Sequence, residues 1–155
     1  MSYPNGKFPN YALTNIPGGR LASGAPARSY LAMRYFIGRK HGVWLTPTGP
    51  SSSYRPYAKQ VEFYNNYLNG NGPLAARPGY SNHGVGRAVD IPTSQMQAMV
   101  RKYGHRFGWG IAGGQLSSDA MSEPWHMTYR GGNRLTPRGA YWFRRYKASQ
   151  KKKKK

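Results

Sequence analysis

Two short segments constrain the fold of this chain more than any other feature: residues 81–90 (SNHGVGRAVD) and residues 123–126 (EPWH). The whole chain holds only four acidic residues and four histidines, and two of each lie in these segments. The segments are distant in the sequence, so their side chains can act together only if the fold sets them side by side. Any structure proposed for the chain therefore has to bring the two segments into contact.

The polar residues in these segments match the donor set of a metal centre. His83, Asp90 and His126 could supply three ligands, which is the number that a catalytic zinc site takes from the protein while it keeps one position open for water. Glu123 is then left outside the ligand set. A carboxylate in that place can accept a proton from the water that attacks the substrate.

Residues 86–91 are predicted to form a strand, because apolar and small residues alternate there with a period of two. Asp90 would then share one face of the strand with Gly86 and Ala88. Because both neighbours are very small, the face has room above it. A metal ion and a substrate could occupy that room.

Residues 125–129 are predicted to form a second strand, with His126 and Thr128 on the face opposite Met127. Pro124 disfavours a regular helix across this segment, so it is not the helical HExxH metal-binding motif. A fully extended chain would separate Glu123 from His126 by roughly 10 Å. A local bend is therefore needed if both residues serve one metal.

The two segments carry a family resemblance. The pattern S-x-H-x-x-G-x-A-x-D followed by E-x-W-H resembles the zinc D,D-carboxypeptidases of the VanY and VanX kind, and it is equally similar to the phage L-alanyl-D-glutamate endolysins that share their fold. Ser53-Tyr54-Arg55-Pro56, followed by Gln60, resembles the upstream S-G-Y-R-S-x-x-x-Q motif of that family. The resemblance covers residues 28–130 in three ordered motifs.

The resemblance implies a role for each matching residue. It implies that zinc is bound by His83, Asp90 and His126, that catalysis uses Glu123 and Arg55, and that substrate is bound by Arg55, Ser81, Gln60 and Tyr54. Arg55 would bind a substrate carboxylate or the developing oxyanion. The chain departs from the pattern at Ser53, Pro56 and Met127. These positions are not ligands, but they leave the shape of the substrate pocket open.

Composition limits the possible partners. The net charge of +20 on 17.4 kDa predicts attraction to polyanions, either nucleic acid or the acidic polymers of a bacterial wall. The chain has no cysteine, which excludes disulfides, thiolate zinc ligands and thiol nucleophiles. No apolar stretch is long enough to span a membrane, and residues 1–19 show no signal peptide.

The remaining pattern predicts a single small domain of mixed structure. Helices are expected at residues 28–40, 57–68, 94–103 and 137–147, and a short strand at 43–46. In the second helix Pro56 would take the first position, and Val61, Tyr64 and Leu68 would form its buried stripe. The loop 69–80 would border the site and affect specificity. The expected divisions are an irregular arm (1–27), a catalytic domain (28–148) and a disordered basic tail (149–155).

We therefore expect an α+β fold like that of the D-Ala-D-Ala peptidases and the hedgehog domain: a small antiparallel sheet that carries zinc, with helices packed behind. The expected function is a zinc-dependent peptidase that cuts peptidoglycan stem peptides. A monomeric phage endolysin of L-Ala–D-Glu endopeptidase type, made in the host cytoplasm and acting on the wall after release, suits the size and charge. A D-Ala–D-Ala carboxypeptidase has the same motifs. A basic nucleic-acid-binding protein and a non-catalytic zinc-binding protein are the alternatives from other classes.

Overall fold

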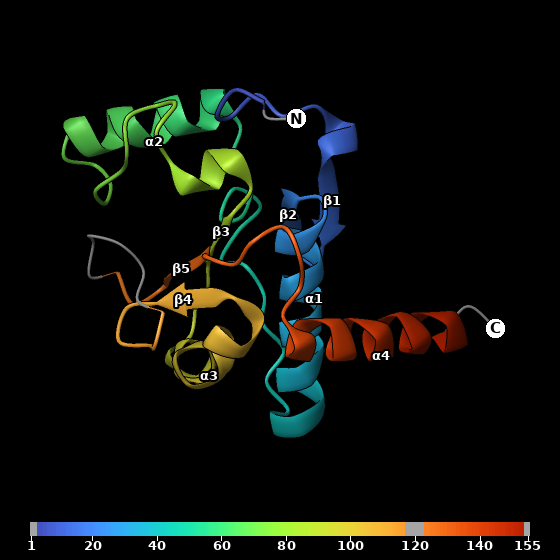
Figure 1. Cartoon of the computed structure of the whole chain (residues 1–155). Helices are drawn as coiled ribbons and strands as arrows, with labels where there is room; N and C mark the ends of the chain where they lie inside the picture. The colour runs from blue at the N-terminus through green and yellow to red at the C-terminus, as the bar shows by residue number, and fades with distance from the viewer. Residues whose placement is uncertain (1–2, 117–122, 154–155) are drawn as a thin grey trace.

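The computed structural model describes residues 3–116 and 123–153, and this part of the chain forms four α-helices and five β-strands (Figure 1). The helices are α1 (Ala25–His41), α2 (Tyr57–Leu68), α3 (Ser94–Tyr103) and α4 (Pro137–Lys153). The strands are β1 (Leu13–Ile16), β2 (Gly19–Ala22), β3 (Ala88–Asp90), β4 (Trp109–Ile111) and β5 (His126–Tyr129).

A three-stranded antiparallel sheet in the order β3-β5-β4 lies at the centre. Asp90 on β3 is directly opposite His126 on β5, and Ala88 is opposite Thr128. The strands expected at residues 86–91 and 125–129 are therefore confirmed, although each is shorter than its pattern. β4 was not expected, because the glycines around it hide the short buried run of Trp109–Ile111.

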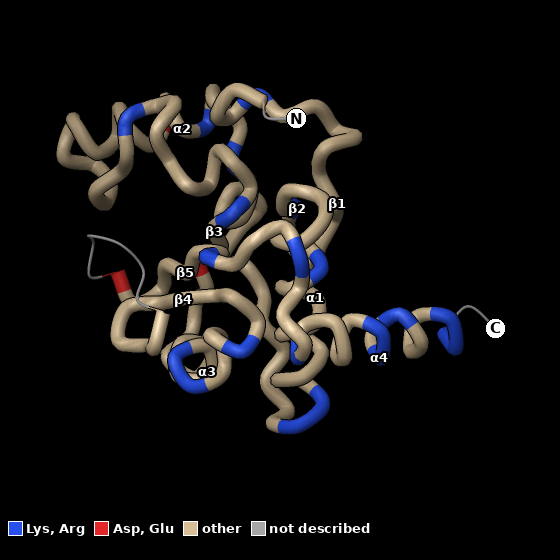
Figure 2. Tube along the Cα trace, in the orientation of Figure 1, with Lys and Arg blue, Asp and Glu red and all other residues tan. Residues whose placement is uncertain are grey.

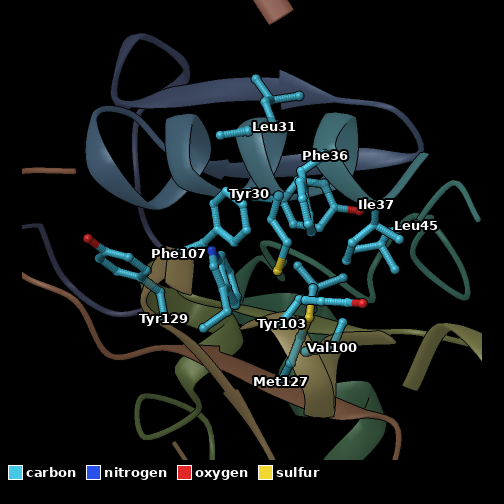
Figure 3. Close-up of a cluster of buried hydrophobic side chains, with 14 of the residues drawn as sticks. Tyr30, Leu31, Phe36, Ile37, Leu45, Val100, Tyr103, Phe107, Met127 and Tyr129 are labelled. Carbon is cyan, nitrogen blue, oxygen red and sulfur yellow. The ribbon is translucent and has the colours of Figure 1, made fainter. Parts of the chain in front are cut away.

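One face of this sheet packs against α1 and forms an aromatic-rich core (Figure 3). Tyr30 and Phe36 from α1 lie over the side chains of the sheet and α3, and the Phe36 ring contacts Tyr103 at 5.3 Å between centroids. The buried Trp109 donates its indole N–H to Ser29 Oγ at 2.9 Å, which satisfies both polar groups. The core thus covers one sheet face, and the face carrying Asp90 and His126 is left for other contacts.

The helix boundaries follow recognisable sequence signals. α1 begins earlier than expected, with Pro26 in its first turn. It ends at His41 and is followed by Gly42, whose φ of 71° suits a left-handed cap. α3 begins after Thr93, whose hydroxyl accepts the Met96 N–H at 3.0 Å and so caps the helix. The expected helices at these positions are therefore confirmed.

The N-terminal segment is more ordered than the irregular arm expected over residues 1–27. β1 and β2 pair as an antiparallel hairpin with Thr14 opposite Leu21. Leu21 is fully buried in the core. Only a few apolar side chains mark these strands, and Gly, Pro and Asn dominate the segment, so the alternation is too weak to read from the sequence.

Two further expectations were wrong. Residues 43–46 form no strand; Val43 and Leu45 are buried, and the Leu45 carbonyl accepts a hydrogen bond from Arg34 Nε at 2.6 Å instead of a strand partner. α2 has the predicted bounds, with Pro56 as its N-cap, but Leu68 is 60% exposed and the buried residue of the helix is Gln60. α2 therefore lies over polar groups and not over the apolar core.

α4 continues to Lys153, beyond the expected end near Lys147 and into the region expected to be disordered. Its Trp142 ring packs on Phe36 of α1 at 5.2 Å, which holds the first half of the helix against the body. The second half carries exposed lysines, and Figure 2 shows α4 projecting from the body with basic positions along it. Lys154 and Lys155 lie outside the described residues. In the part of the chain that the structure describes, no helix is long and apolar enough to span a membrane.

Candidate metal centre and active site

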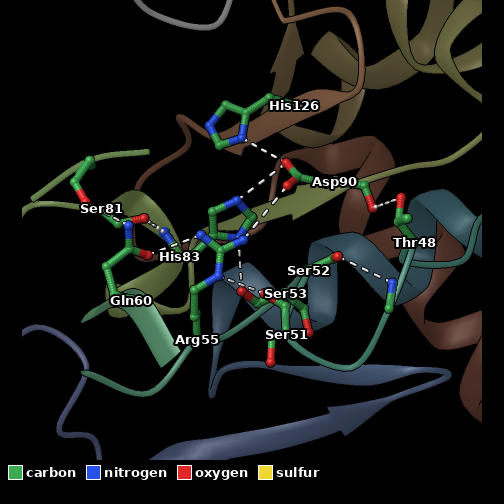
Figure 4. A network of polar contacts seen from close by, with 12 residues as sticks. Thr48, Ser51, Ser52, Ser53, Arg55, Gln60, Ser81, His83, Asp90 and His126 are labelled. Carbon is green, nitrogen blue, oxygen red and sulfur yellow. Dashed lines mark hydrogen bonds and ion pairs between the residues drawn. The ribbon is translucent and has the colours of Figure 1, made fainter. Parts of the chain in front are cut away.

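His83, Asp90 and His126 converge on one point (Figure 4). Asp90 Oδ1 lies 2.9 Å from His126 Nδ1 and 3.2 Å from His83 Nε2. One ligand atom from each of the three residues falls within 4.8 Å of the others. The structure therefore brings together the three side chains that the sequence singled out as metal ligands.

The sheet register explains why Asp90 and His126 lie close together. Asp90 and His126 are directly opposed in an antiparallel pair, so their side chains project from the same face at close range. His83 comes from the 3₁₀ turn η2 (Asn82–Val85), where Ser81 Oγ accepts the His83 N–H at 3.1 Å. Gly86, at a φ of 67°, then redirects the chain from this turn into β3.

The bend that the sequence required before His126 is present. Glu123 and His126 are joined by a backbone hydrogen bond in which the His126 N–H donates to the Glu123 carbonyl at 3.1 Å. Residues 123–126 therefore form a turn, and Pro124 takes one of its two central positions. The turn brings Glu123 back beside the cluster, although it does not belong to the set of three converging ligand atoms.

The orientation of the His83 ring is fixed by a backbone carbonyl. His83 Nδ1 lies 2.9 Å from the Ser53 carbonyl oxygen, which can only accept, so Nδ1 carries the proton and donates. The lone pair of the neutral ring is then on Nε2, which faces Asp90. This carbonyl contact is the kind of support that holds a metal-binding histidine in the correct tautomer.

The electrostatics of the cluster favour a cation. Burial would raise the pKa of the Asp90 carboxyl, but the hydrogen bond that His126 donates, together with the nearby His83 ring, outweighs burial and holds that pKa well below its ordinary value. Burial lowers the pKa of His83, which favours the neutral form of its ring. Metal ligands must be deprotonated in this way. Two imidazole nitrogens and one carboxylate oxygen fit Zn²⁺ as a donor set.

Arg55 is held rigidly beside the cluster. Its side chain is buried, Nε donates to the Ser51 carbonyl at 2.9 Å, and Nη1 donates to Gln60 Oε1 at 3.0 Å. Its guanidinium lies over the Phe63 ring at 4.2 Å and approaches Asp90 Oδ2 to 3.8 Å. Burial lowers the Arg55 pKa, whereas the carboxylates around it raise it. Sequence motifs alone predicted Arg55, and its surroundings show how it is fixed.

A cavity of about 540 Å³ opens over the cluster. It is lined by all of the predicted site residues except one: Arg55, Gln60, Ser81, His83, Asp90, Glu123 and His126. The exception is Tyr54, which is buried against the N-terminal segment, where its hydroxyl accepts the Phe8 N–H at 3.0 Å. The structure therefore places Tyr54 apart from the residues with which the motif groups it.

The wall of the cavity also holds apolar residues that sequence reasoning missed. Phe63, Leu74, Tyr80 and Trp125 all line it. Leu74 and Tyr80 belong to the loop 69–80, which does border the site as predicted. Trp125 is 38% exposed although it is a large aromatic beside a ligand histidine. Its position inside the EPWH motif was the signal that could have identified it.

The N-terminal segment supports the turn that carries His83. Asn5 Nδ2 donates to the Ser81 carbonyl at 2.8 Å, and the Gly6 N–H donates to the Gly84 carbonyl at 2.7 Å. A Cβ on Gly84 would lie 1.8 Å from Asn5 Oδ1, so a larger residue there would displace the Asn5 side chain from this contact. The N-terminal segment was expected to be an irregular arm. Its hydrogen bonds instead support the turn that carries a ligand of the candidate metal centre.

We expect Asn5→Ala to weaken zinc binding by roughly tenfold, because loss of a supporting hydrogen bond lets the His83 turn move. Asn15→Ala is the matched control, since Asn15 is exposed on β1. Zinc affinity of both variants, measured by competition with a chromophoric chelator, tests the expectation. Equal affinity in the two variants would show that the segment does not support the metal centre.

Comparisons with known proteins place this geometry in a family. A family profile described as VanY, D-alanyl-D-alanine carboxypeptidase, matches residues 38–132, which is more than half of the chain. The search of curated proteins returned no match.

Solved structures share the fold. VanYB in complex with D-alanine-D-alanine is 21% identical with a TM-score of 0.57, over 88% of this chain and 83% of that chain. A mutant VanY D,D-pentapeptidase from a VanB-type resistance cassette, in complex with Zn(II), is 21% identical with a TM-score of 0.55, over 90% and 92%. The LdcB LD-carboxypeptidase is 25% identical with a TM-score of 0.52, over 74% and 67%.

The expected α+β fold is therefore confirmed. The family match and the convergence of two histidines with one carboxylate also confirm the zinc peptidase class expected from the sequence. The chain belongs to the VanY family of D-alanyl-D-alanine carboxypeptidases.

Proposed function

We propose that this protein is a zinc-dependent peptidase of bacterial peptidoglycan, with His83, Asp90 and His126 as the metal ligands and Glu123 as the base. The observation that carries the proposal is the convergence of the three ligand atoms within 4.8 Å on the floor of a cavity that Glu123 also lines. A cluster held only for stability would not need a cavity above it or a carboxylate beside it.

Glu123 is suited to move a proton. Zinc, when bound, supplies a Lewis acid that lowers the pKa of a water molecule. Burial raises the pKa of the Glu123 carboxyl, which makes its carboxylate a better proton acceptor than an exposed glutamate. Glu123 takes a proton from the attacking water and returns it to the leaving amine, as a general base and then a general acid.

Arg55 is suited to hold a negative charge. A rigid guanidinium fork binds a carboxylate with two parallel hydrogen bonds, and the contacts to Ser51 and Gln60 keep this fork from turning away. We assign Arg55 to the terminal carboxylate of the substrate or to the developing oxyanion. Gln60 positions Arg55, because its Oε1 accepts from the guanidinium while its Nε2 donates to the Ala76 carbonyl at 2.7 Å.

Ser81 is suited to donate a single hydrogen bond to the substrate. Its hydroxyl oxygen already accepts the His83 N–H, but a hydroxyl also carries one donor. Because Ser81 lines the cavity, this donor can reach a substrate carbonyl. Tyr54 is not included in the proposed substrate site, since its contacts lie on the N-terminal segment.

We propose that the D-Ala–D-Ala bond is the one that is cut. The description of the matched family favours the D-Ala–D-Ala bond, and a fixed Arg55 beside the metal centre suits a substrate with a free carboxyl terminus. An L-Ala–D-Glu endopeptidase of the phage endolysin type, the first expectation from the sequence, is the second candidate and is favoured by the charge of +20. Mass spectrometry of a digested stem pentapeptide separates them: free D-Ala supports the carboxypeptidase, and a new N-terminal D-Glu supports the endopeptidase.

The basic charge suits retention on the wall. α4 has no acidic residue, and its exposed basic residues are Arg138, Arg144, Arg145, Lys147, Lys151, Lys152 and Lys153 (Figure 2). A helix of this kind attracts polyanions by long-range, salt-sensitive forces. We propose that α4 holds the enzyme to the acidic polymers of the wall and not to the peptide that it cuts.

We expect a variant with Arg144, Lys147 and Lys151 all changed to Gln to bind purified walls about tenfold more weakly and with a smaller dependence on salt. The kcat/KM for a soluble stem peptide should stay the same, because α4 does not line the cavity. Co-sedimentation with walls at several salt concentrations provides the measurement.

The matched control removes three charges elsewhere, by changing Lys7, Lys59 and Lys102 to Gln. All three are exposed and dispersed over the surface. If this control loses wall binding to the same extent as the α4 variant, net charge and not α4 determines retention. Stronger loss of DNA binding than of wall binding in the α4 variant would instead favour nucleic acid as its partner.

A further inference from the structure

The side chain of Phe63 lies against the Arg55 guanidinium on the wall of the active-site cavity. Arg55 Cζ is 4.2 Å from the centre of the Phe63 ring, which is the shortest cation–ring distance in the described part of the chain. Phe63 is partly buried, and it lines the cavity together with Arg55. None of the sequence motifs includes Phe63, and the mechanism proposed above gives it no role.

Phe63 and Gln60 lie on one face of α2, because they are three residues apart in the helix. Gln60 Oε1 accepts from Arg55 Nη1, and the Ser51 carbonyl accepts from Arg55 Nε. Both hydrogen bonds lie near the plane of the guanidinium, so by themselves they leave the group able to tilt about the line that joins them. An aromatic ring stacked on the face of the guanidinium removes this freedom.

Arg55 is a buried cation in an unfavourable place. It is 6% exposed and lies at the N-terminal end of α2, where the helix dipole disfavours positive charge. Asp90 lies 3.8 Å away, but it is also a proposed zinc ligand, so the metal shares its charge in the loaded protein. The negative face of the Phe63 ring is a partner for which zinc does not compete.

The Arg55 guanidinium keeps donors for a substrate. Of its five N–H groups, one on Nε and one on Nη1 are used by hydrogen bonds within the described residues. Nη2 is the nitrogen that approaches Asp90, so its donors lie on the side of the metal cluster. Pairing of a guanidinium with a carboxylate through two parallel hydrogen bonds is planar. A tilt of the guanidinium would therefore turn these donors away from a carboxylate bound beside the cluster.

We propose that Phe63 is a positioning residue that sets the plane of the Arg55 guanidinium, and through it the preference for substrates that end in a free carboxylate. The proposal rests on the proposed function, which assigns Arg55 to the substrate, and deepens it by naming a residue on which specificity depends. A peptide whose carboxyl terminus is amidated offers Arg55 no such charge. Phe63 thus favours removal of a C-terminal residue over cleavage within a longer chain.

The test compares two stem pentapeptides that end in D-Ala–D-Ala and differ only in a free or an amidated carboxyl terminus. Zinc-loaded wild-type protein should prefer the free carboxylate by about a hundredfold in kcat/KM, since a charge-assisted pair of hydrogen bonds is lost in the amide. Phe63→Leu should lower this ratio about tenfold, mainly through a higher KM for the free peptide. Phe63→Tyr keeps a ring face and should restore the wild-type ratio.

Tyr64→Leu is the matched control, because it removes an aromatic ring from the next position of α2. Tyr64 packs against Tyr67 at 6.2 Å between ring centres and does not line the cavity. It should keep the wild-type ratio. Phe63→Met is the second variant, used if thermal melting shows Phe63→Leu to be unfolded. A wild-type ratio in Phe63→Leu or its substitute, or an equal loss in Tyr64→Leu, would overturn the positioning role.

The contact itself can be followed without substrate. A ring on the face of the guanidinium shifts the NMR signal of the Arg55 Nε–H, so Phe63→Leu should move that signal and Tyr64→Leu should not. An unmoved signal would show that the stacking is absent in solution and would overturn the proposal. A moved signal with an unchanged peptide preference would show a contact that does not set specificity, which also overturns it.

Calorimetry on zinc-loaded Glu123→Ala protein separates failure of this proposal from failure of the proposed function. If the wild type cuts neither peptide, but Glu123→Ala binds the free carboxylate more tightly and Phe63→Leu in that background weakens this binding, the positioning role stands and the peptidase is rejected. If the wild type cuts both peptides equally well, the peptidase stands and the role of Phe63 is rejected.

Discussion

Replacing Glu123 with Ala should leave zinc bound and reduce turnover of a stem peptide by about 10²–10⁴-fold, the usual contribution of a general acid-base group. The side chain lines the cavity beside the cluster, yet it is not among the three residues whose ligand atoms converge. Removing it should therefore take away proton transfer without changing the metal site. Zinc content by atomic absorption and kcat on a soluble peptide are the two measurements.

Glu123→Gln is the isosteric companion and should be as inactive as Glu123→Ala, because an amide keeps the size but cannot accept the proton. Glu62→Ala is the matched control, since Glu62 is an exposed acid paired only with Lys59 at 3.1 Å in the described part of the chain. It should be fully active. Full activity of Glu123→Ala would remove Glu123 from the mechanism, and bound zinc without hydrolysis in the wild type would favour a non-catalytic zinc protein.

Replacing Asp90 with Ala should abolish stoichiometric zinc binding. Asp90 Oδ1 lies within 3.2 Å of both histidine nitrogens of the cluster, so it is central to the donor set. Its loss also leaves the buried Arg55 guanidinium without its nearest carboxylate. Breaking a buried ion pair costs about 3 kcal/mol in the free energy of unfolding, so the metal-free variant should melt below the metal-free wild type.

The zinc measurement for Asp90→Ala is direct titration, and thermal melting with and without zinc gives the stability. Zinc should raise the melting temperature of the wild type much more than that of the variant, because metal binding is coupled to folding. Glu62→Ala is again the matched loss of one carboxylate and should bind zinc normally. An unchanged zinc stoichiometry in Asp90→Ala would contradict the ligand set.

The candidate site was largely predictable, because its chemistry is concentrated in a few residue types. A chain with four acidic residues that places two of them beside two histidines restricts the possible metal ligands to a short list. The strand alternation around Asp90 and the need for a bend before His126 followed from local geometry alone. The structure adds the facts that depend on pairing, above all the register that sets Asp90 opposite His126.

The features that were missed depend on tertiary contacts. The contact of Asn5 with the Ser81 carbonyl joins segments far apart in the sequence, and nothing in the local pattern marks it. The hairpin of β1 and β2 is local, but its four-residue strands carry too few apolar residues for their alternation to be recognised. The buried face of α2 was also predicted wrongly, because it depends on a polar contact with another segment. Its period suggested an apolar stripe ending at Leu68, whereas the helix buries Gln60 in order to hold Arg55. Polar burial of this kind leaves no signal in hydrophobic periodicity.

Digestion of purified peptidoglycan by the zinc-loaded protein, with and without a chelator, tests the central claim most directly. Mass spectrometry of the soluble products gives the cleaved bond. The account predicts cleavage by the wild type that the chelator stops and added zinc restores, and no cleavage by Glu123→Ala protein carrying its full zinc. Cleavage that persists after verified removal of the metal, or no cleavage of any wall type by zinc-loaded wild type, would contradict it.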